Sequence, residues 1–317
     1  MIEGASLVIG RSARRAGYGE VMRIVSLLPA ATDLVAVLGR LPDLVGRTHE
    51  CDWPPGLVER VPVVTRAEFD PDALSSREIS EATHRGSGLY TLDSAQLARL
   101  APDVVLTQDL CEVCAVSYRQ VSEAVRTLDT GPLVVSLEPA TLGGVLDCLR
   151  QVGDVLGVPS RAAAEIAALR QRLDALGSPV PERRVVALEW LDPIWPAGHW
   201  VPEQIALAGG EPSLAGAGEH TRPVPWEAVV EARPDVLLLM PCGFAPERTL
   251  AEAPALANLP GWADLPAVRA GEGWVLDGPA HFNRPGPRVV RGAEILAAIL
   301  GGETPPPDEA RRLTPTR

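Results

Sequence analysis

Positive charge is scarce in this sequence. Its 317 residues include 41 Asp and Glu but only 29 Lys and Arg, which gives a formal net charge of −12 at pH 7. A nucleic-acid-binding protein needs a basic face, because neutralising phosphates supplies much of its affinity. We therefore expect no nucleic-acid partner and favour a small molecule as ligand.

Long apolar runs are also missing. A membrane-spanning helix needs about 20 mainly apolar residues, and a secretory signal needs an apolar stretch of about 7 to 15 residues. Only the short run ASLVIG is apolar before Arg11, and no cysteine that could carry a lipid precedes Cys51. We expect no direct membrane insertion and a cytoplasmic location. A periplasmic or extracellular location is the alternative if translation does not start at Met1.

Cysteine is rare, and its number is odd. Five cysteines do not suit a disulfide framework in a chain of this size, and in a reducing compartment they remain thiols or act as metal ligands. Cys148 stands in a helical pattern and is expected to be buried. The other four follow predicted strands: Cys51, Cys111, Cys114 and Cys242.

Strand and helix patterns alternate along the chain. Apolar runs such as RIVSLL at Arg23 and DVVLTQ at Asp103 are each followed by turn residues and helical periodicity, which is typical of parallel sheets covered by helices. A second series starts with RRVVALEW at Arg183. The sequence therefore predicts an α/β fold with two Rossmann-like lobes built on parallel sheets.

Between the two series lies a segment rich in strong helix formers, with Ser160 as a capping residue and Gly177 at its end. We predict one long rigid helix that joins the lobes; a helix that only covers a sheet is the alternative. The predicted parts are a flexible N-terminal extension (1–21), an N-terminal lobe (22–158), the linking helix (159–178), a C-terminal lobe (179–302) and a disordered tail (303–317).

Unusual polar and aromatic residues stand just after the predicted strands. Ligands of open parallel sheets bind beyond the carboxyl ends of the strands, so we expect these residues to line a cleft between the lobes. The candidate ligand-binding residues are His49, Glu50, Asp52, Trp53, Tyr90, Glu189, Trp190, Asp192, Trp195, His199, Trp200, Phe282 and Asn283.

Five segments together resemble one known group: RIVSLLPAATDLVAVLG, THECDWPP, LYTLDSAQLARLAPDVVLTQDLCEVCAVS, LEWLDPIWPAGHWVPEQIALAGG and FNRPGPRVVRGAEIL. They resemble the cobalamin-binding branch of the class III, TroA-like periplasmic binding proteins, which share a rigid helical backbone. The resemblance covers about residues 22–300. It implies two lobes joined by one rigid helix, a ligand held between them, and the permease of an ATP-binding-cassette (ABC) importer as the usual partner.

The first hypothesis is therefore non-enzymatic binding of a corrinoid such as cobalamin. A corrin ring is flat and mostly apolar with a rim of amides, so it needs aromatic faces and scattered hydrogen-bonding groups. Trp53 on one lobe and Trp195 and Trp200 on the other would supply the faces. We expect a monomer that requires no cofactor and serves ABC-type uptake or intracellular corrinoid handling.

Two alternatives stay open. The C-x-x-C spacing of Cys111 and Cys114 lets two thiolates meet one ion, so these residues, with Cys51 and Cys242, are candidate ligands for a metal or an iron–sulfur cluster. Small cysteines lining an apolar pocket would give the same pattern. Catalysis is not expected, because neither a G-x-S-x-G elbow nor a P-loop is present; a chelatase-like activity is the remaining enzymatic alternative.

Overall fold

The structure, a computed structural model, describes residues 8–9, 22–67, 74–84, 90–108, 131–176 and 183–313. The predicted metal ligands Cys111 and Cys114 lie outside these ranges. The chain divides into two compact units, each described below by itself. Unit 1 comprises Met1–Ala73, Ala82–Pro139 and Gly143–Ala168, and unit 2 comprises Leu74–Glu81, Ala140–Leu142 and Leu169–Arg317.

Unit 1 is built on a five-stranded sheet in the order β1-β7-β6-β2-β3. Strands β7, β6, β2 and β3 run parallel, whereas the short β1 pairs antiparallel with β7. Strands β2 and β6 are buried along their whole length, as expected for a parallel sheet with both faces covered. The strands are β1 (Val8–Ile9), β2 (Ile24–Ser26), β3 (Leu44–Arg47), β6 (Val104–Thr107) and β7 (Leu133–Ser136).

Helices and a small hairpin complete the N-terminal half of the chain. Strands β4 (Thr65–Ala67) and β5 (Tyr90–Leu92) pair antiparallel. The side chain of Asp93 caps the following helix by accepting a 2.8 Å hydrogen bond from the backbone N–H of Gln96, as its position in the sequence predicts. The helical segments are α1 (Pro29–Val37), η1 (Leu41–Asp43), η2 (Val58–Arg60), α2 (Ser76–His84), α3 (Ser94–Leu100), α5 (Leu142–Val155) and α6 (Pro159–Asp174).

Unit 2 is built on a six-stranded sheet in the order β10-β8-β11-β12-β13, with β9 paired to β8. Strands β10, β8, β11 and β12 are parallel, and β9 and β13 are antiparallel to their neighbours. The strands are β8 (Arg183–Leu191), β9 (Ile194–Pro196), β10 (Gly210–Ser213), β11 (Val236–Leu239), β12 (Gly273–Leu276) and β13 (Ala310–Arg312).

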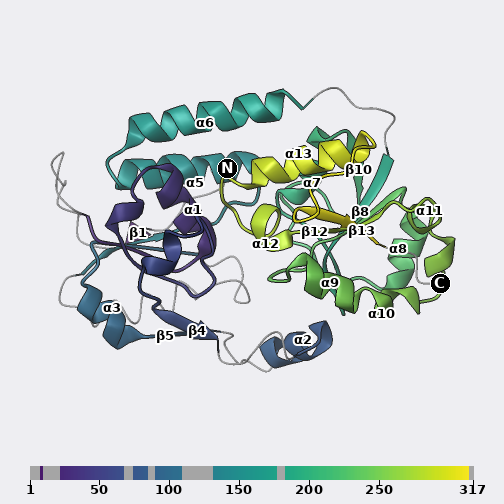
Figure 1. The fold of residues 1–317 in the computed structure, drawn as a ribbon, viewed down its shortest axis with the longest axis horizontal. Coiled ribbons are helices and arrows are strands. Elements are labelled where there is room, and N and C mark those ends of the chain that lie inside the picture. The colour runs from purple at the N-terminus through teal and green to yellow at the C-terminus, as the bar shows by residue number, and fades with distance from the viewer. Residues whose placement is uncertain are drawn as a thin grey trace. The chain divides into compact units, whose positions relative to one another are not determined.

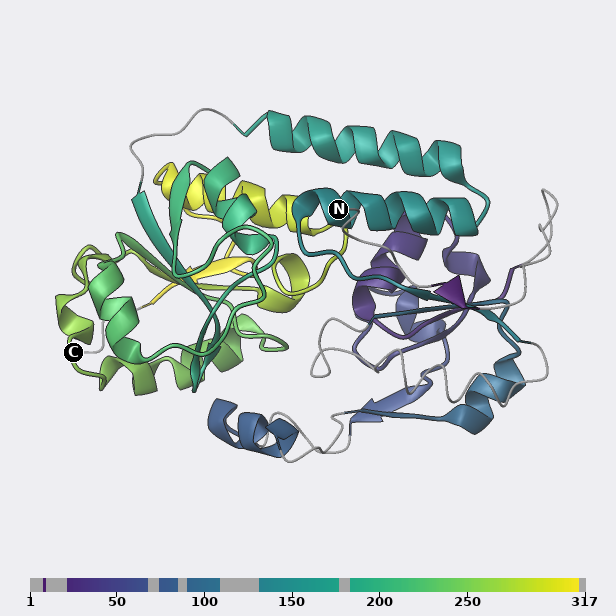
Figure 2. The ribbon, with the colours of Figure 1, turned by 180° about the vertical axis from the view of Figure 1, so that it is seen from behind.

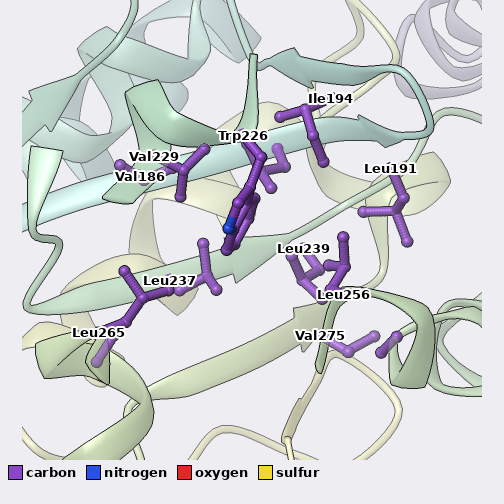
Figure 3. Close-up of a cluster of buried hydrophobic side chains, with 13 residues drawn as sticks. Val186, Leu191, Ile194, Trp226, Val229, Leu237, Leu239, Leu256, Leu265 and Val275 are labelled. Atoms are coloured by element: carbon purple, nitrogen blue, oxygen red, sulfur yellow. The ribbon is translucent and has the colours of Figure 1, made fainter. Parts of the chain in front are cut away.

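Helices cover both faces of the unit 2 sheet (Figure 1), with α7 and α13 on one face and α8 to α11 on the other. Figure 3 shows the core on the second face, where the indole of Trp226 lies among Val186, Val229 and Leu237. The helical segments are α7 (Val201–Leu207), α8 (Trp226–Ala232), α9 (Pro246–Glu252), α10 (Pro254–Ala257), η4 (Trp262–Asp264), α11 (Pro266–Arg269), α12 (Gly278–His281) and α13 (Val289–Leu300).

The α/β fold with parallel sheets, predicted from the alternating patterns, is confirmed. Helix α6 occupies most of the segment predicted to form a linking helix, although its role as a link stays a prediction. Within the described ranges, no helix is long and apolar enough to cross a bilayer.

Two short strands lie within the segments predicted as a flexible extension and a disordered tail. Val8–Ile9, within the predicted flexible extension, forms the edge strand β1 on β7. Ala310–Arg312, within the predicted disordered tail, forms β13 on β12, and Ala310 is buried. Both strands pair with partners far away in the sequence, so the backbone hydrogen bonds that hold them leave no local periodicity to detect.

Helices α5 and α6 approach each other very closely at one point in unit 1 (Figure 1). A β-carbon added to Gly153 of α5 would lie 2.4 Å from the Cβ atom of Ala162 in α6. Contacts this short do not occur between real Cβ atoms, so the glycine is what permits the helices to pack here. The turn between the two helices contains Gly157, whose φ of +70° is in the left-handed region that favours glycine.

We predict that Gly153→Ala lowers the free energy of unfolding by about 1–3 kcal/mol, because the methyl group overpacks this contact. The direction of the change in unfolding free energy is informative, because alanine in a helix interior is otherwise about 0.5–1 kcal/mol more favourable than glycine. Gly216→Ala is the control, because the nearest atom to its added Cβ is Glu219 Oε2 at 3.5 Å. Urea denaturation measures both variants. An unchanged or increased stability of Gly153→Ala would contradict the prediction.

Candidate functional site

The loop after β3 carries the densest group of predicted site residues in unit 1, and a buried arginine holds it. Arg47, the last residue of β3, donates from Nη1 to the carbonyl oxygens of Thr48 at 3.1 Å and Cys51 at 3.2 Å. Its Nε atom donates to the carbonyl oxygen of Val61 at 3.2 Å. One guanidinium group therefore satisfies three carbonyl groups and fixes the path of the loop. Sequence reasoning missed Arg47, although its place at the end of an apolar run was a visible indication.

His49 is oriented by the two antiparallel strands β4 and β5 of unit 1. Its backbone N–H donates to Oγ1 of Thr65 at 3.0 Å, and its Nδ1 atom lies 2.8 Å from the same hydroxyl. The Nε2 atom is 3.3 Å from Oε1 of Glu50, and the ring is 5.1 Å from that of Tyr90 between centroids. The structure therefore brings together three predicted site residues, His49, Glu50 and Tyr90. Their role in ligand binding stays a prediction.

Cys51, Asp52 and Trp53 differ in exposure. Cys51 is 5% exposed, and its Sγ atom lies 3.0 Å from Oγ1 of Thr32, which in turn donates to Oγ of Ser26 at 2.9 Å. Asp52 is exposed, and Trp53, which forms a cis peptide bond with Pro54, is partly exposed. Within this group the thiol points into a buried polar cluster, while Trp53 presents surface beyond the strand ends.

In unit 2 the segment predicted as a loop after a strand is a β-hairpin. Strand β8 extends through Trp190 to Leu191 and turns through the cis Asp192–Pro193 bond into β9, where Trp195 pairs with Trp190. The register shifts between Leu188 and Trp190, so Glu189 is the extra residue of a bulge. Bulges change the direction of side chains relative to the regular alternation of a strand.

The carboxyl group of Glu189 is held by this bulge and by the loop that follows β9. The backbone N–H of Gly198 donates to Oε2 of Glu189 at 3.4 Å, and the side chain of Thr221 lies beside the carboxyl group. Burial raises the pKa of Glu189 to about 7, and the N–H group of Gly198 and the polar side chain of Thr221 oppose this shift only in part. Glu189 is therefore a carboxylic acid that changes charge near neutral pH.

Thr221 also positions the neighbouring indole. The Nε1 atom of Trp195 donates to Oγ1 of Thr221 at 2.8 Å, and Oγ1 donates to the carbonyl oxygen of Pro196 at 2.7 Å. Trp195 remains partly exposed, so its ring is fixed while part of its surface is accessible. Nothing in the sequence around Thr221 identified it as part of the site.

His199 adopts an unusual backbone conformation. Its φ of +52° is in the left-handed region, and two 2.8 Å bonds hold it there, from its own N–H to Glu219 and from the N–H of Gly218 to its carbonyl oxygen. These bonds bring its ring to 5.3 Å from that of His220. Burial lowers the pKa of His199, and the neighbouring His220 lowers it further. The side-chain Nδ1 atom of His199 is buried and has no hydrogen-bond partner among the described residues.

Three further predicted site residues pack within unit 2: Trp200, Phe282 and Asn283. Trp200 is 4% exposed, and its Nε1 atom donates to the carbonyl oxygen of Phe282 at 2.8 Å, while Phe282 is 1% exposed. Asn283 donates from Nδ2 to the carbonyl oxygen of Met240 at 3.1 Å. The side chains of Trp200 and Asn283 thus link the ends of different elements, and a direct contact of these residues with ligand stays a prediction.

Trp190 and Asp192 contact the segment Leu74–Glu81 of the same unit. The Nε1 atom of Trp190 donates to the carbonyl oxygens of Ser76 at 3.2 Å and Asp192 at 3.1 Å. The carboxylate of Asp192 accepts a 2.9 Å bond from Nε of Arg77. The side chains of both predicted ligand-binding residues therefore form hydrogen bonds with other residues of the protein.

A metal centre is not visible in the part of the chain that the structure describes. There, no group of three or more His, Cys, Asp or Glu residues is placed to hold a metal ion. Cys51 and Cys242 are consequently not members of such a group. Since Cys111 and Cys114 lie outside the described residues, the metal or iron–sulfur hypothesis for them stays a prediction.

Comparison with known proteins identifies the class. The family of periplasmic binding proteins matches residues 24–279, so the chain belongs to this family. A comparison with curated proteins found no significant match.

Solved structures share the class III fold at low sequence identity. A periplasmic heme-binding protein from Pseudomonas aeruginosa is 21% identical, with a TM-score of 0.68 over 92% of this chain and 98% of that one. The heme-binding protein RhuT from Roseiflexus sp. RS-1 is 23% identical, with a TM-score of 0.65 over 89% and 98%. The vitamin B12-binding protein BtuF of Vibrio cholerae is 20% identical, with a TM-score of 0.59 over 88% and 96%.

We predict that Arg47→Met destabilises the protein by about 2–3 kcal/mol, because a side chain of similar length without donors leaves buried carbonyl groups unsatisfied. Arg66→Met is the control, since Arg66 is exposed and its Nε atom donates to the side-chain hydroxyl of Thr91, not to a buried backbone carbonyl group. Urea denaturation measures both, and equal effects of the two substitutions would contradict the prediction.

A second prediction concerns the pH dependence of stability. The pKa of Glu189 is about 7 in the folded protein, above its ordinary value of 4.5, so its contribution to stability is fully present below pH 4.5 and is lost as the pH rises to 7. Glu189→Gln keeps an oxygen acceptor but cannot ionise. Relative to the wild type, the variant should therefore gain about 2–3 kcal/mol between pH 4.5 and pH 7. Denaturation at several pH values tests this, and a difference that does not change with pH would contradict it.

Proposed function

We propose that this protein is a non-enzymatic receptor for a corrinoid of the cobalamin type, which it delivers to an ABC permease. Family membership supports a solute-binding role. A vitamin B12-binding protein is among the structures that share the fold, as is an ABC transporter substrate-binding protein from Listeria monocytogenes. The sequence segments that resemble the cobalamin-binding branch favour the corrinoid among the possible ligands.

The proposal rests on the solvent exposure of two tryptophan side chains. Trp53, in the loop after β3 of unit 1, and Trp195, in strand β9 of unit 2, both keep accessible surface. Trp190 and Trp200, by contrast, are at most 9% exposed, and their indole N–H groups are bonded within unit 2. Partly exposed indoles are suited to the flat, largely apolar face of a corrin ring. We therefore narrow the proposed aromatic contacts to Trp53 and Trp195.

Polar groups near these two rings suit the amide rim of such a ligand. The carboxyl group of Glu189 lies beside Thr221, the residue that fixes the indole of Trp195, and His49 and Glu50 precede Trp53 by a few residues. A protonated carboxylic acid both donates and accepts hydrogen bonds, as a primary amide does. Glu189 could therefore pair with a side-chain amide of a corrinoid in either direction.

Heme is the second candidate ligand, favoured by one specific observation. Burial lowers the pKa of His199, and this favours the neutral imidazole that binds iron. Two of the similar structures are described as heme-binding proteins. Absorbance titrations with cyanocobalamin and with hemin distinguish the two ligands, and His199→Ala would change the hemin spectrum only if the imidazole binds the iron.

We predict that the protein binds cyanocobalamin at micromolar or lower concentration and that Trp53→Ala raises the Kd at least tenfold, about 1.4 kcal/mol, through the loss of an aromatic face. Leu57→Ala is the matched control, because Leu57 lies in the same segment and is 50% exposed. Fluorescence or absorbance titration measures both variants. No binding of cyanocobalamin by the wild type would overturn the proposed function, whereas an unchanged affinity of Trp53→Ala would place the ligand elsewhere.

A further inference from the structure

The segment Leu74–Glu81 belongs to unit 2 by its contacts, but its neighbours along the chain do not. Strands β4 and β5, which precede and follow it, belong to unit 1. The segment contains most of helix α2, which is seen near α9 in Figure 2. Along the sequence, unit 1 is therefore interrupted by eight residues that belong to unit 2. We call these eight residues the strap.

Side chains of unit 2 donate hydrogen bonds to backbone carbonyl groups of the strap. Nη2 of Arg248 donates to the carbonyl oxygen of Leu74 at 2.6 Å, and Nε1 of Trp190 donates to that of Ser76 at 3.2 Å. The two donors are organised by one ring, because the guanidinium of Arg248 lies 3.6 Å above Phe244, whose centroid is 5.1 Å from that of Trp190. Arg248, Phe244 and Trp190 therefore form an ordered receptor for the start of the strap.

The side chains of the strap add three further contacts. Ser76 is 2% exposed and donates from its hydroxyl to Oε2 of Glu252. Arg77 pairs with Asp192, and the hydroxyl of Ser80 lies 3.5 Å from the carbonyl oxygen of Asp192. The Arg77 pair is well exposed, so it contributes little, whereas the buried Ser76 contact should matter more.

The strap is ordered by its own sequence as well. The carboxylate of Glu78 accepts 2.8 Å bonds from the backbone N–H and the hydroxyl of Ser75, and the N–H of Glu78 lies 3.4 Å from that hydroxyl. This is a capping box, which stabilises the first turn of a helix. A segment with a preformed first turn loses less conformational entropy when it docks.

We propose that Leu74–Glu81 is a reversible strap that docks on unit 2 and, while docked, occupies the N–H group of Trp190 and the carboxylate of Asp192. Two features make release less costly than unfolding. Among the described residues, the hydrophobic cluster around Trp226 includes no strap residue, and the six-stranded sheet is formed without the strap. The strap is held by these polar contacts and by one buried apolar side chain, that of Ile79, which is 4% exposed. A short helix with so little buried apolar surface opens with a smaller free energy than the core beneath it. This inference rests on packing alone and holds for any ligand.

Native-state hydrogen exchange of the full chain tests the strap. In the double variant Ser76→Ala/Arg77→Ala, the backbone amides of α2 should exchange at least tenfold faster, while those of β8, β11 and β12 keep their wild-type rates. Alanine has a higher helix propensity than serine or arginine, so faster exchange would report undocking and not a weaker helix. The control is Arg150→Ala, which removes an exposed 2.9 Å pair with Asp147 on α5, comparable with the Arg77 pair.

Two results would overturn the proposal. Unchanged exchange in α2 would show that these contacts do not hold the segment. A parallel acceleration of exchange in β8, β11 and β12 would show that the segment is an integral part of unit 2 and not a strap that opens by itself. The measurement needs no ligand, so either result leaves the proposed function to be judged by titration.

Discussion

Backbone carbonyl groups beyond the ends of parallel strands need hydrogen-bond donors, and this requirement organises the site regions of both units. Inside the sheet the neighbouring strands supply the donors, but the loops after the strands have no such partners. In unit 1 the buried guanidinium of Arg47 serves the loop that carries Cys51 and Trp53. In unit 2 the side chains of Trp200, Gln204 and Asn283 donate to carbonyl groups at the ends of other elements. The site regions are rigid because buried side chains hold their backbones.

The strands were predictable from sequence where an unbroken apolar run records burial on both faces. Strands β6 and β11 are of this kind, since each is buried at every residue. The elements that the sequence analysis missed depend on a distant partner. Strands β1 and β13 exist because the edges of β7 and β12 offer hydrogen bonds, and the bulged β8–β9 hairpin places Glu189 where no simple alternation would put it. Pairing of this kind is not encoded within a short window of residues.

The candidate site was predictable as a set of positions but not as a set of roles. The rule that polar and aromatic residues after parallel strands lie near ligands selected Trp53, Trp190, Trp195 and Trp200 together. The structure separates them by what their indole N–H groups and surfaces do, as the contacts of Trp190 with Ser76 and of Trp200 with Phe282 illustrate. Thr221, which fixes Trp195 and contacts Glu189, has no distinguishing sequence context. A residue's role therefore followed from its partners, which come from remote parts of the chain.

The pKa shifts of three buried groups in unit 2 bear on the kind of ligand that the protein would bind. Burial raises the pKa of Glu189 to about 7 and lowers the pKa values of His199 and His281, so in each case it favours the uncharged form. The chain as a whole is strongly acidic, yet these three buried groups of unit 2 tend toward neutrality. Uncharged donors and acceptors beside a fixed indole interact with a ligand through hydrogen bonds and dispersion. They offer little electrostatic stabilisation to a charged ligand. These uncharged groups are one argument for the proposed corrinoid, whose rim carries neutral amides.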